Sequence, residues 1–78
     1  MTARKQRLLV FIVAYNAERT IEDVLRRIPH TLGETYDVEI LIIDDSSQDG
    51  TFERGYAVKQ ADDLPFTLHV LFNPVNQG

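Results

Sequence analysis

The chain has 78 residues, no cysteine and a formal net charge of −4. The lack of cysteine excludes disulfides and thiolate metal sites, and the acidic balance excludes the broad cationic face that nucleic acid requires. With 44% apolar and 26% charged residues, the composition is typical of a small globular domain in a reducing, cytoplasmic setting.

The N-terminal segment is basic, with Arg4-Lys5-Gln6-Arg7 ahead of the first apolar run. We interpret residues 1–6 as a solvated lead-in, and a contact with an anionic membrane surface is the alternative. The apolar run that follows is too short to span a bilayer and has no small-residue cleavage pattern after it. We therefore expect a cytoplasmic protein, with peripheral association at the inner face of the membrane as the alternative for a full-length protein.

The first two predicted elements are a strand and a helix. Residues 8–15 are continuously apolar, which predicts a strand covered on both faces, as in a parallel sheet flanked by helices. Residues 21–28 carry apolar side chains at helical spacing, which predicts an amphipathic helix packed on the sheet. Pro29 ends this helix, because the residue before a proline disfavours helical torsions. The apolar positions are Ile21, Val24, Leu25 and Ile28.

A second strand and a second helix follow the connection at 30–37. Residues 38–43 predict a buried strand that ends at Asp44-Asp45, and the polar stretch 46–50 predicts a turn. A helix is expected over about 51–61, although Gly55 costs it about 1 kcal/mol relative to alanine. Asp49, Gly50 and Thr51 all remain candidates for its cap. The side chains expected to face the sheet are Phe52, Tyr56 and the stem of Lys59.

A third strand is predicted at residues 66–72, after the break at Leu64-Pro65, and residues 73–78 form a loop. The alternation of strands and helices with short connections predicts a right-handed, parallel β-α-β-α-β unit over residues 7–78. Three strands that end in an open loop indicate an incomplete domain, so we expect further sheet in a parent protein. The exposed edge strand could pair with a second copy.

Ligands of open parallel sheets bind outside the carboxyl ends of the strands. Three polar loops gather there, at 15–18, 44–50 and 73–78. Tyr15 offers an aromatic face and a hydroxyl group to a nucleobase; the alternative is a tyrosine that caps the core with its hydroxyl in water.

Asp44 and Asp45 are adjacent in an extended segment, so their side chains point to opposite sides. They are therefore a poor acid–base pair, but one of them can face a pocket and accept hydrogen bonds from a base or a ribose. The alternative is that both only tie down the turn at 46–50.

Several other sites are not supported by the sequence. His30 is expected at a helix exit and His69 on a strand face, neither at metal-ligand spacing. No Gly-x-Gly-x-x-Gly follows the first strand, and no Gly-x-x-x-x-Gly-Lys occurs. A pyrophosphate would thus be held in another way, most commonly by a divalent cation.

Three motifs together resemble the N-terminal part of family 2 glycosyltransferases, and most closely the polyprenyl- or dolichol-phosphate sugar transferases. They are Val13-Ala14-Tyr15-Asn16, the block Asp44-Asp45-Ser46-Ser47-Gln48-Asp49-Gly50-Thr51, and Asn73-x-x-Asn76-x-Gly78. The resemblance covers the chain from Leu8 onward. It departs from the family at Val13, where proline is usual, and at Ala17, where lipid-phosphate branches often carry glutamate.

The resemblance implies that residues 1–78 are a partial nucleotide-sugar-binding domain, the first half of a Rossmann-like GT-A fold. Tyr15 would contact the base, Asp45 would accept from the base or ribose, and Asp44 would brace the strand end. Val13 and Ile43 would line the same slot, next to a loop that begins at Asn76 and Gly78. The expected nucleotide-binding residues are Val13, Ala14, Tyr15, Ala17, Ile43 and Asp45, and the expected supporting residues are Asp44, Glu18, Asn76 and Gly78.

By the same resemblance, the parent enzyme transfers sugar from a UDP- or GDP-sugar to a lipid phosphate or polysaccharide, with Mg²⁺ or Mn²⁺. The family's metal-binding Asp-x-Asp follows a fourth strand, and this sequence contains no Asp-x-Asp. We therefore expect no catalytic residue and no metal ligand here, and no sugar transfer by these 78 residues alone. The alternative function is a non-catalytic nucleotide-binding or regulatory α/β module.

Overall fold

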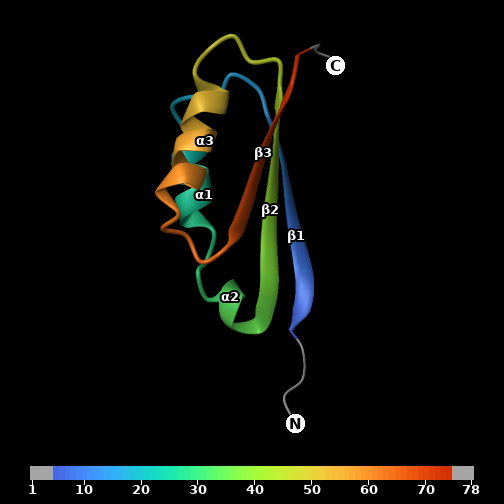
Figure 1. Ribbon diagram of the computed structural model, residues 1–78. Helices are drawn as coiled ribbons and strands as arrows, with labels where there is room; N and C mark the ends of the chain where they lie inside the picture. The colour runs from blue at the N-terminus through green and yellow to red at the C-terminus, as the bar shows by residue number, and fades with distance from the viewer. Residues whose placement is uncertain (1–4, 75–78) are drawn as a thin grey trace.

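The computed structural model describes residues 5–74 and shows a three-stranded sheet with helices on one side (Figure 1). The fold class is α/β, and the predicted β-α-β-α-β order is confirmed. A short helix, α2, lies within the segment predicted as a plain connection. The elements are β1 (Gln6–Ala14), α1 (Ile21–Arg27), α2 (Leu32–Thr35), β2 (Tyr36–Asp45), α3 (Thr51–Ala61) and β3 (Thr67–Asn73).

The three strands are parallel and lie in the order β1-β2-β3. The register aligns Ala14 with Asp44 and Asp45 with Asn73, so the carboxyl ends of all three strands meet at one edge. Each right-handed crossover steps in the same direction across the sheet, which places α1 and α3 on the same face (Figure 1).

The core lies between this helix-covered face and the two helices. Leu25 of α1 and Ile40 of β2 are fully buried. Around them lie the other buried apolar side chains, Ala14, Ile21, Val38, Ile42, Val58, Phe66 and Leu68. None of the helices in the described part of the chain is long and apolar enough to cross a bilayer.

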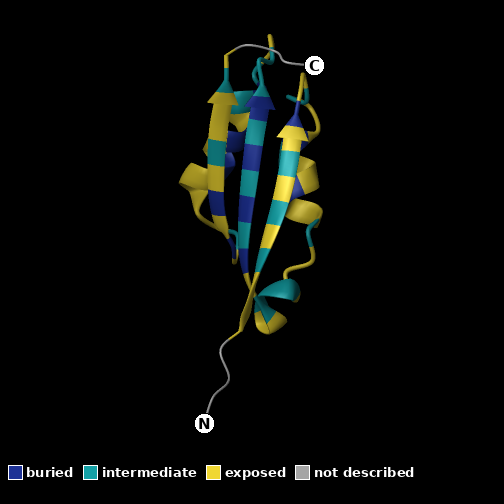
Figure 2. Cartoon of the chain, turned by 90° about the vertical axis from the view of Figure 1, so that its right-hand side faces the viewer, coloured by how far each residue is buried: buried dark blue, intermediate teal, exposed yellow. Residues whose placement is uncertain are grey.

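The opposite face of the sheet is open (Figure 2). Leu9, Phe11 and Val13 of β1 are 57%, 54% and 62% exposed, and Leu71 of β3 is 53% exposed. The expectation that helices cover both faces is therefore wrong for this chain. The reason is topological, because two crossovers in the same direction cannot place helices on opposite faces.

The face of α3 that meets the sheet also differs from the prediction. Thr51, Gly55 and Val58 are buried, whereas Tyr56 is 44% exposed and Lys59 is exposed. Gly55 faces the sheet: a Cβ built on it would make ordinary contacts, at 3.6 Å from Val70 Cγ1 and 3.9 Å from Ile42 Cδ1. The helix thus turns the side that carries Thr51, Gly55 and Val58 toward the sheet.

Two further apolar side chains, Val24 and Phe52, do not pack on the centre of the sheet as their helical spacing predicts. Val24 of α1 is 46% exposed, although Ile21 and Leu25 beside it are buried as expected. Phe52 of α3 packs against Phe72 near the end of β3, with ring centroids 5.8 Å apart. Phe52 therefore covers the rim of the sheet and not its centre.

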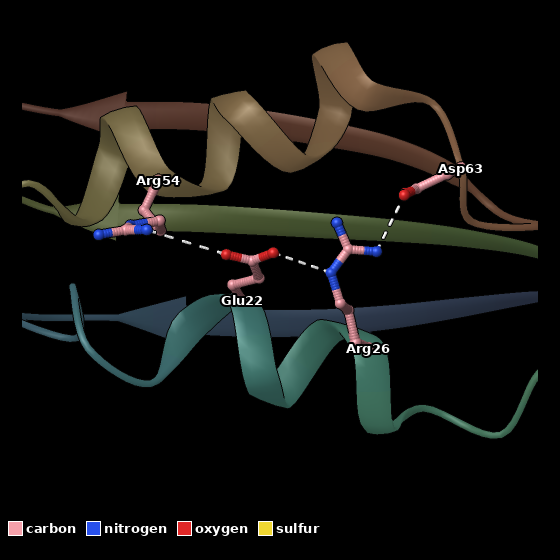
Figure 3. A network of polar contacts seen from close by, with 4 residues as sticks. All are labelled: Glu22, Arg26, Arg54 and Asp63. Carbon is pink, nitrogen blue, oxygen red and sulfur yellow. Dashed lines mark hydrogen bonds and ion pairs between the residues drawn. The ribbon is translucent and has the colours of Figure 1, made fainter.

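A chain of ion pairs joins the outer surfaces of the helices (Figure 3). Arg26 Nε donates to Glu22 at 2.9 Å, and its Nη1 donates at 3.0 Å to Asp63, in the loop just after α3. Arg54 of α3 lies 3.9 Å from the other oxygen of Glu22. These side chains are between 37% and 55% exposed, so solvent screens them and each pair contributes at most about 1 kcal/mol.

Candidate functional site

Two of the polar loops predicted at the carboxyl edge of the sheet meet there, together with residues 73 and 74 of the third. The turn after β1 lies beside the turn after β2, as the hydrogen bonds below show. On the other side, Asn73 Nδ2 donates to Asp45 Oδ1 at 3.0 Å, and the Ser46 hydroxyl donates to the Pro74 carbonyl at 3.3 Å. All three strand ends are therefore linked at this edge.

Asp44 and Asp45 lie on opposite faces of the sheet, as the alternation of an extended strand requires. Asp44 is 1% exposed on the helix-covered face. Its Oδ1 accepts from the Ser47 amide at 3.1 Å and from the Ser47 hydroxyl. Within residues 5–74 its Oδ2 has no hydrogen-bond partner, and an unsatisfied buried acceptor of this kind is costly. Asp44 braces the turn, whereas Asp45 is half-buried on the open face.

The apolar residues predicted to line a ligand slot lie next to Asp45. Val13 and Ile43 are register partners on neighbouring strands, two residues before Tyr15 and Asp45 respectively. Val13 and Tyr15 are 62% and 52% exposed, and Ile43 is half-buried. Tyr15 follows the end of β1 at the same edge of the sheet. These four residues are called the open-face edge below. Ala14 is different: its side chain is 4% exposed and belongs to the core.

The remaining residues predicted for the first loop, Ala17 and Glu18, form hydrogen bonds with the loop that follows β2. The Ala17 amide donates to Thr51 Oγ1 at 2.7 Å. The Glu18 amide donates to Asp49 Oδ2 at 3.3 Å, and Glu18 Oε1 accepts from the Gly50 amide at 3.0 Å. Ala17 and Glu18 thus hold the loops together, and their contacts are with protein.

The start of α3 resolves the three candidates for its cap. Gly50 occupies the cap position and makes no side-chain cap bond. Asp49 Oδ1 instead accepts from the Thr51 amide at 3.0 Å and from the Thr51 hydroxyl. The hydroxyl bond from Thr51 lowers the pKa of Asp49, with backbone amides adding to the effect.

Two reciprocal bonds join the loops nearer the sheet. The Asn16 amide donates to Ser47 Oγ at 2.8 Å, and Asn16 Oδ1 accepts from the Gln48 amide at 3.0 Å. With the three bonds of Ala17 and Glu18, they make five hydrogen bonds between residues 16–18 and 47–51, called the cross-loop clamp below. The sequence signals only a polar turn here, and the clamp was not predicted.

The acidic residues of this edge do not form a metal site. Across residues 5–74 no group of three or more His, Asp or Glu side chains is placed to hold an ion. Asp44 and Asp49 already accept hydrogen bonds from Ser47 and Thr51. Asn76 and Gly78, predicted to begin the loop beside the nucleotide, lie outside the described residues.

Two surface depressions lie at the other end of the molecule, around the turn at 62–64. They have volumes of about 460 and 610 Å³. His30 borders the second and meets Phe66 edge-on at a centroid distance of 6.0 Å. His30 follows α1 and His69 is exposed on β3, as predicted for both.

The model of glycosyl transferase family 2 matches residues 9–78. The chain belongs to glycosyl transferase family 2. Its parallel unit is accordingly part of a Rossmann-like GT-A domain, and the match spans both halves of the cross-loop clamp as well as the open-face edge. Neither the curated proteins nor the solved structures contain a significant match to the chain.

Proposed function

We propose that the open-face edge binds the nucleotide of a UDP- or GDP-sugar donor. The carrying observation is that Asp45, on the open face, lies beside the apolar pair of Val13 and Ile43 and at the same edge as exposed Tyr15. Membership of a sugar-transferring family supports the same ligand. On this proposal the full-length enzyme passes the sugar to a lipid phosphate or a polysaccharide.

The chemistry of each residue suits one part of a nucleoside. The ring of Tyr15 can contact a base, and the side chains of Val13 and Ile43 supply apolar surface beside it. The carboxylate of Asp45 accepts hydrogen bonds from a base N–H or from ribose hydroxyls. Asn73 orients this carboxylate through its bond to Oδ1.

Transfer itself requires groups that this chain does not supply. We propose that the full-length enzyme uses Mg²⁺ or Mn²⁺, which would stabilise the departing nucleoside diphosphate. The acidic residues in the described part of the chain do not fit such an ion, and the sequence has no Asp-x-Asp. The 78 residues alone are therefore proposed to bind the donor nucleotide without transferring sugar.

The open face of the sheet supports placing this unit in a larger domain. Parallel sheets are normally covered on both faces, and here Leu9, Phe11 and Leu71 are more than half exposed. We propose that further parts of the full-length protein cover them, and that in isolation the exposed edge strand pairs with a second copy. We propose a cytoplasmic enzyme, with Lys5 and Arg7 near the inner face of a membrane.

The alternative is a non-catalytic nucleotide-binding or regulatory module of the same fold. An assay of the full-length protein with a nucleotide sugar and Mg²⁺ or Mn²⁺ separates the two functions. A transferase releases UDP or GDP from the nucleotide sugar, and a non-catalytic module does not.

Asp45→Ala tests the proposed site. We expect the dissociation constant of the full-length protein for UDP or GDP to rise more than about tenfold, because a hydrogen bond to a charged acceptor contributes about 1.5–3 kcal/mol. Calorimetric titration with UDP or GDP, in the presence of Mg²⁺ or Mn²⁺, measures this dissociation constant. Asp37→Ala, an exposed aspartate at the opposite end of β2, is the matched control. Equal affinities for the wild type and Asp45→Ala would remove Asp45 from the site.

A further inference from the structure

We propose that Ser47 is a positioning residue, which fixes the turn carrying Tyr15 relative to Asp45 before a nucleotide arrives. This inference rests on the proposed function, since it concerns the same site. It follows from the contacts of one hydroxyl group, Ser47 Oγ, with Asn16 on one side and Asp44 on the other.

The Ser47 hydroxyl links the first turn to the buried end of β2. A hydroxyl has one proton to donate, and Ser47 donates it to Asp44 Oδ1. Its lone pairs therefore face the Asn16 amide, which donates to Ser47 Oγ at 2.8 Å. Asp44 is 1% exposed and lies within the paired part of β2, so it is a fixed point. The contacts therefore run from β2 through the Asp44 carboxylate and the Ser47 hydroxyl to the amide of Asn16.

The turn that receives this contact has a left-handed residue at its centre. Asn16 has a φ of 49°, a conformation that asparagine adopts more readily than most other non-glycine residues. Its amide and its side-chain oxygen are both bonded to the second loop. Because Tyr15 immediately precedes Asn16, the direction of Tyr15 depends on a conformation that these two bonds hold.

A second hydroxyl repeats the arrangement at the start of α3. Thr51 donates its proton to Asp49 and accepts from the Ala17 amide at 2.7 Å. Two successive amides of the first loop, those of Asn16 and Ala17, therefore each donate to a hydroxyl that itself donates to a carboxylate. The first of these relays ends on the strand that carries Asp45, which makes Ser47 the residue that couples Tyr15 to Asp45.

Because the turn that carries Tyr15 is already held in place, less free energy is spent on ordering it when a ligand binds. Removal of the Ser47 hydroxyl should therefore weaken nucleotide binding while leaving the fold intact, since Ser47 is only half-buried. Ser47→Thr keeps the hydroxyl and should restore binding. A residue that merely stabilised the fold would lower the melting temperature without changing affinity well below it.

The experiment uses the full-length protein with Ser47→Ala, Ser47→Thr and, as the matched control, Thr35→Ala, an exposed hydroxyl at the opposite end of the sheet. Hydrogen–deuterium exchange of peptides covering residues 14–20, followed by mass spectrometry, reports the turn without any ligand. Titration with UDP and GDP gives affinity. For Ser47→Ala we expect roughly tenfold faster exchange of the Asn16 amide and a ~2- to 10-fold rise in the dissociation constant.

Ser47→Thr should match the wild type within about twofold in both measurements, as should Thr35→Ala. Faster exchange without loss of affinity in Ser47→Ala would overturn the positioning role, and unchanged exchange would overturn the contact itself. If the wild type binds neither nucleotide, the proposed function fails and the positioning role fails with it. The exchange data then report on the clamp alone.

Discussion

The two faces of the sheet use the same strands and have opposite environments. On β2 the residues that face the helices, such as Ile40 and Ile42, are almost fully buried, whereas Leu41 and Ile43 between them are only half-buried. On β1 the same alternation appears, because Phe11 is 54% exposed beside half-buried Val10 and Ile12. These strands are apolar on both faces, but the helices of this chain cover only one of them. The other apolar face is left for a contact outside residues 5–74.

This contrast separates stability from function. The covered face holds the hydrophobic core, and its burial stabilises the unit. The open face carries Val13, Ile43 and Asp45 at its carboxyl edge, where the proposed ligand binds. Substitutions on the two faces should therefore differ in what they change.

The largest effect on stability is expected from Ile40→Ala on the covered face. Ile40 is fully buried, so its truncation should cost about 2–5 kcal/mol, whereas Phe11→Ala on the open face should change the free energy of unfolding by no more than about 0.5 kcal/mol. Urea unfolding of the 78-residue chain measures both, and Ile40→Val, at about 0.5–1.5 kcal/mol, serves if Ile40→Ala does not fold. A comparable loss for Phe11→Ala would show that the open face is covered in solution, as in a self-associated chain.

A smaller effect of opposite sign is expected at Gly55, where α3 meets the covered face. A Cβ there makes ordinary contacts at 3.6 Å or more, so Gly55→Ala should stabilise the chain by up to about 1 kcal/mol through helix propensity. Ala57→Gly, on the exposed side of α3, is the control and should cost a similar amount. Destabilisation by Gly55→Ala, measured by thermal unfolding, would show that α3 lies closer to the sheet than these distances allow.

The smallest effect concerns Asp49, the exposed carboxylate that holds the start of α3. Its pKa is lowered, chiefly because Thr51 donates to it, so its contribution to stability is present above its unfolded pKa of about 3.9. That contribution is lost as the pH falls through the lower folded pKa. Asp49→Asn should therefore lose less stability than the wild type between about pH 5 and pH 2, as measured by thermal unfolding. Parallel profiles would contradict the assignment.

Much of the architecture could be predicted from local patterns. The residues that form α3 were predicted as a helix over 51–61, and Pro29 marked the end of α1. The opposite directions of Asp44 and Asp45 followed from the two-residue period of a strand. These features depend on neighbours in sequence, which a single chain displays directly.

Other features depend on residues far apart in sequence. The clamp bonds from Asn16 to Ser47 and from Ala17 to Thr51 join residues 31 and 34 positions apart, so no local pattern reports them. The rotation of α3 was mispredicted because its aromatic side chains suggested the buried face. In the structure, the buried face is instead the one that carries Thr51, Gly55 and Val58.

The sequence by itself determined the order of strands and helices, the edge at which polar residues gather, and the opposite directions of the Asp44 and Asp45 side chains. Only the tertiary structure decided that both helices cover one face, that Ala14, Ala17 and Glu18 turn toward protein, and that two hydroxyl relays hold the first loop. The physical reason is that periodicity records which side of its own element a residue occupies. The neighbour it meets there is set by the handedness of the crossovers and by close packing.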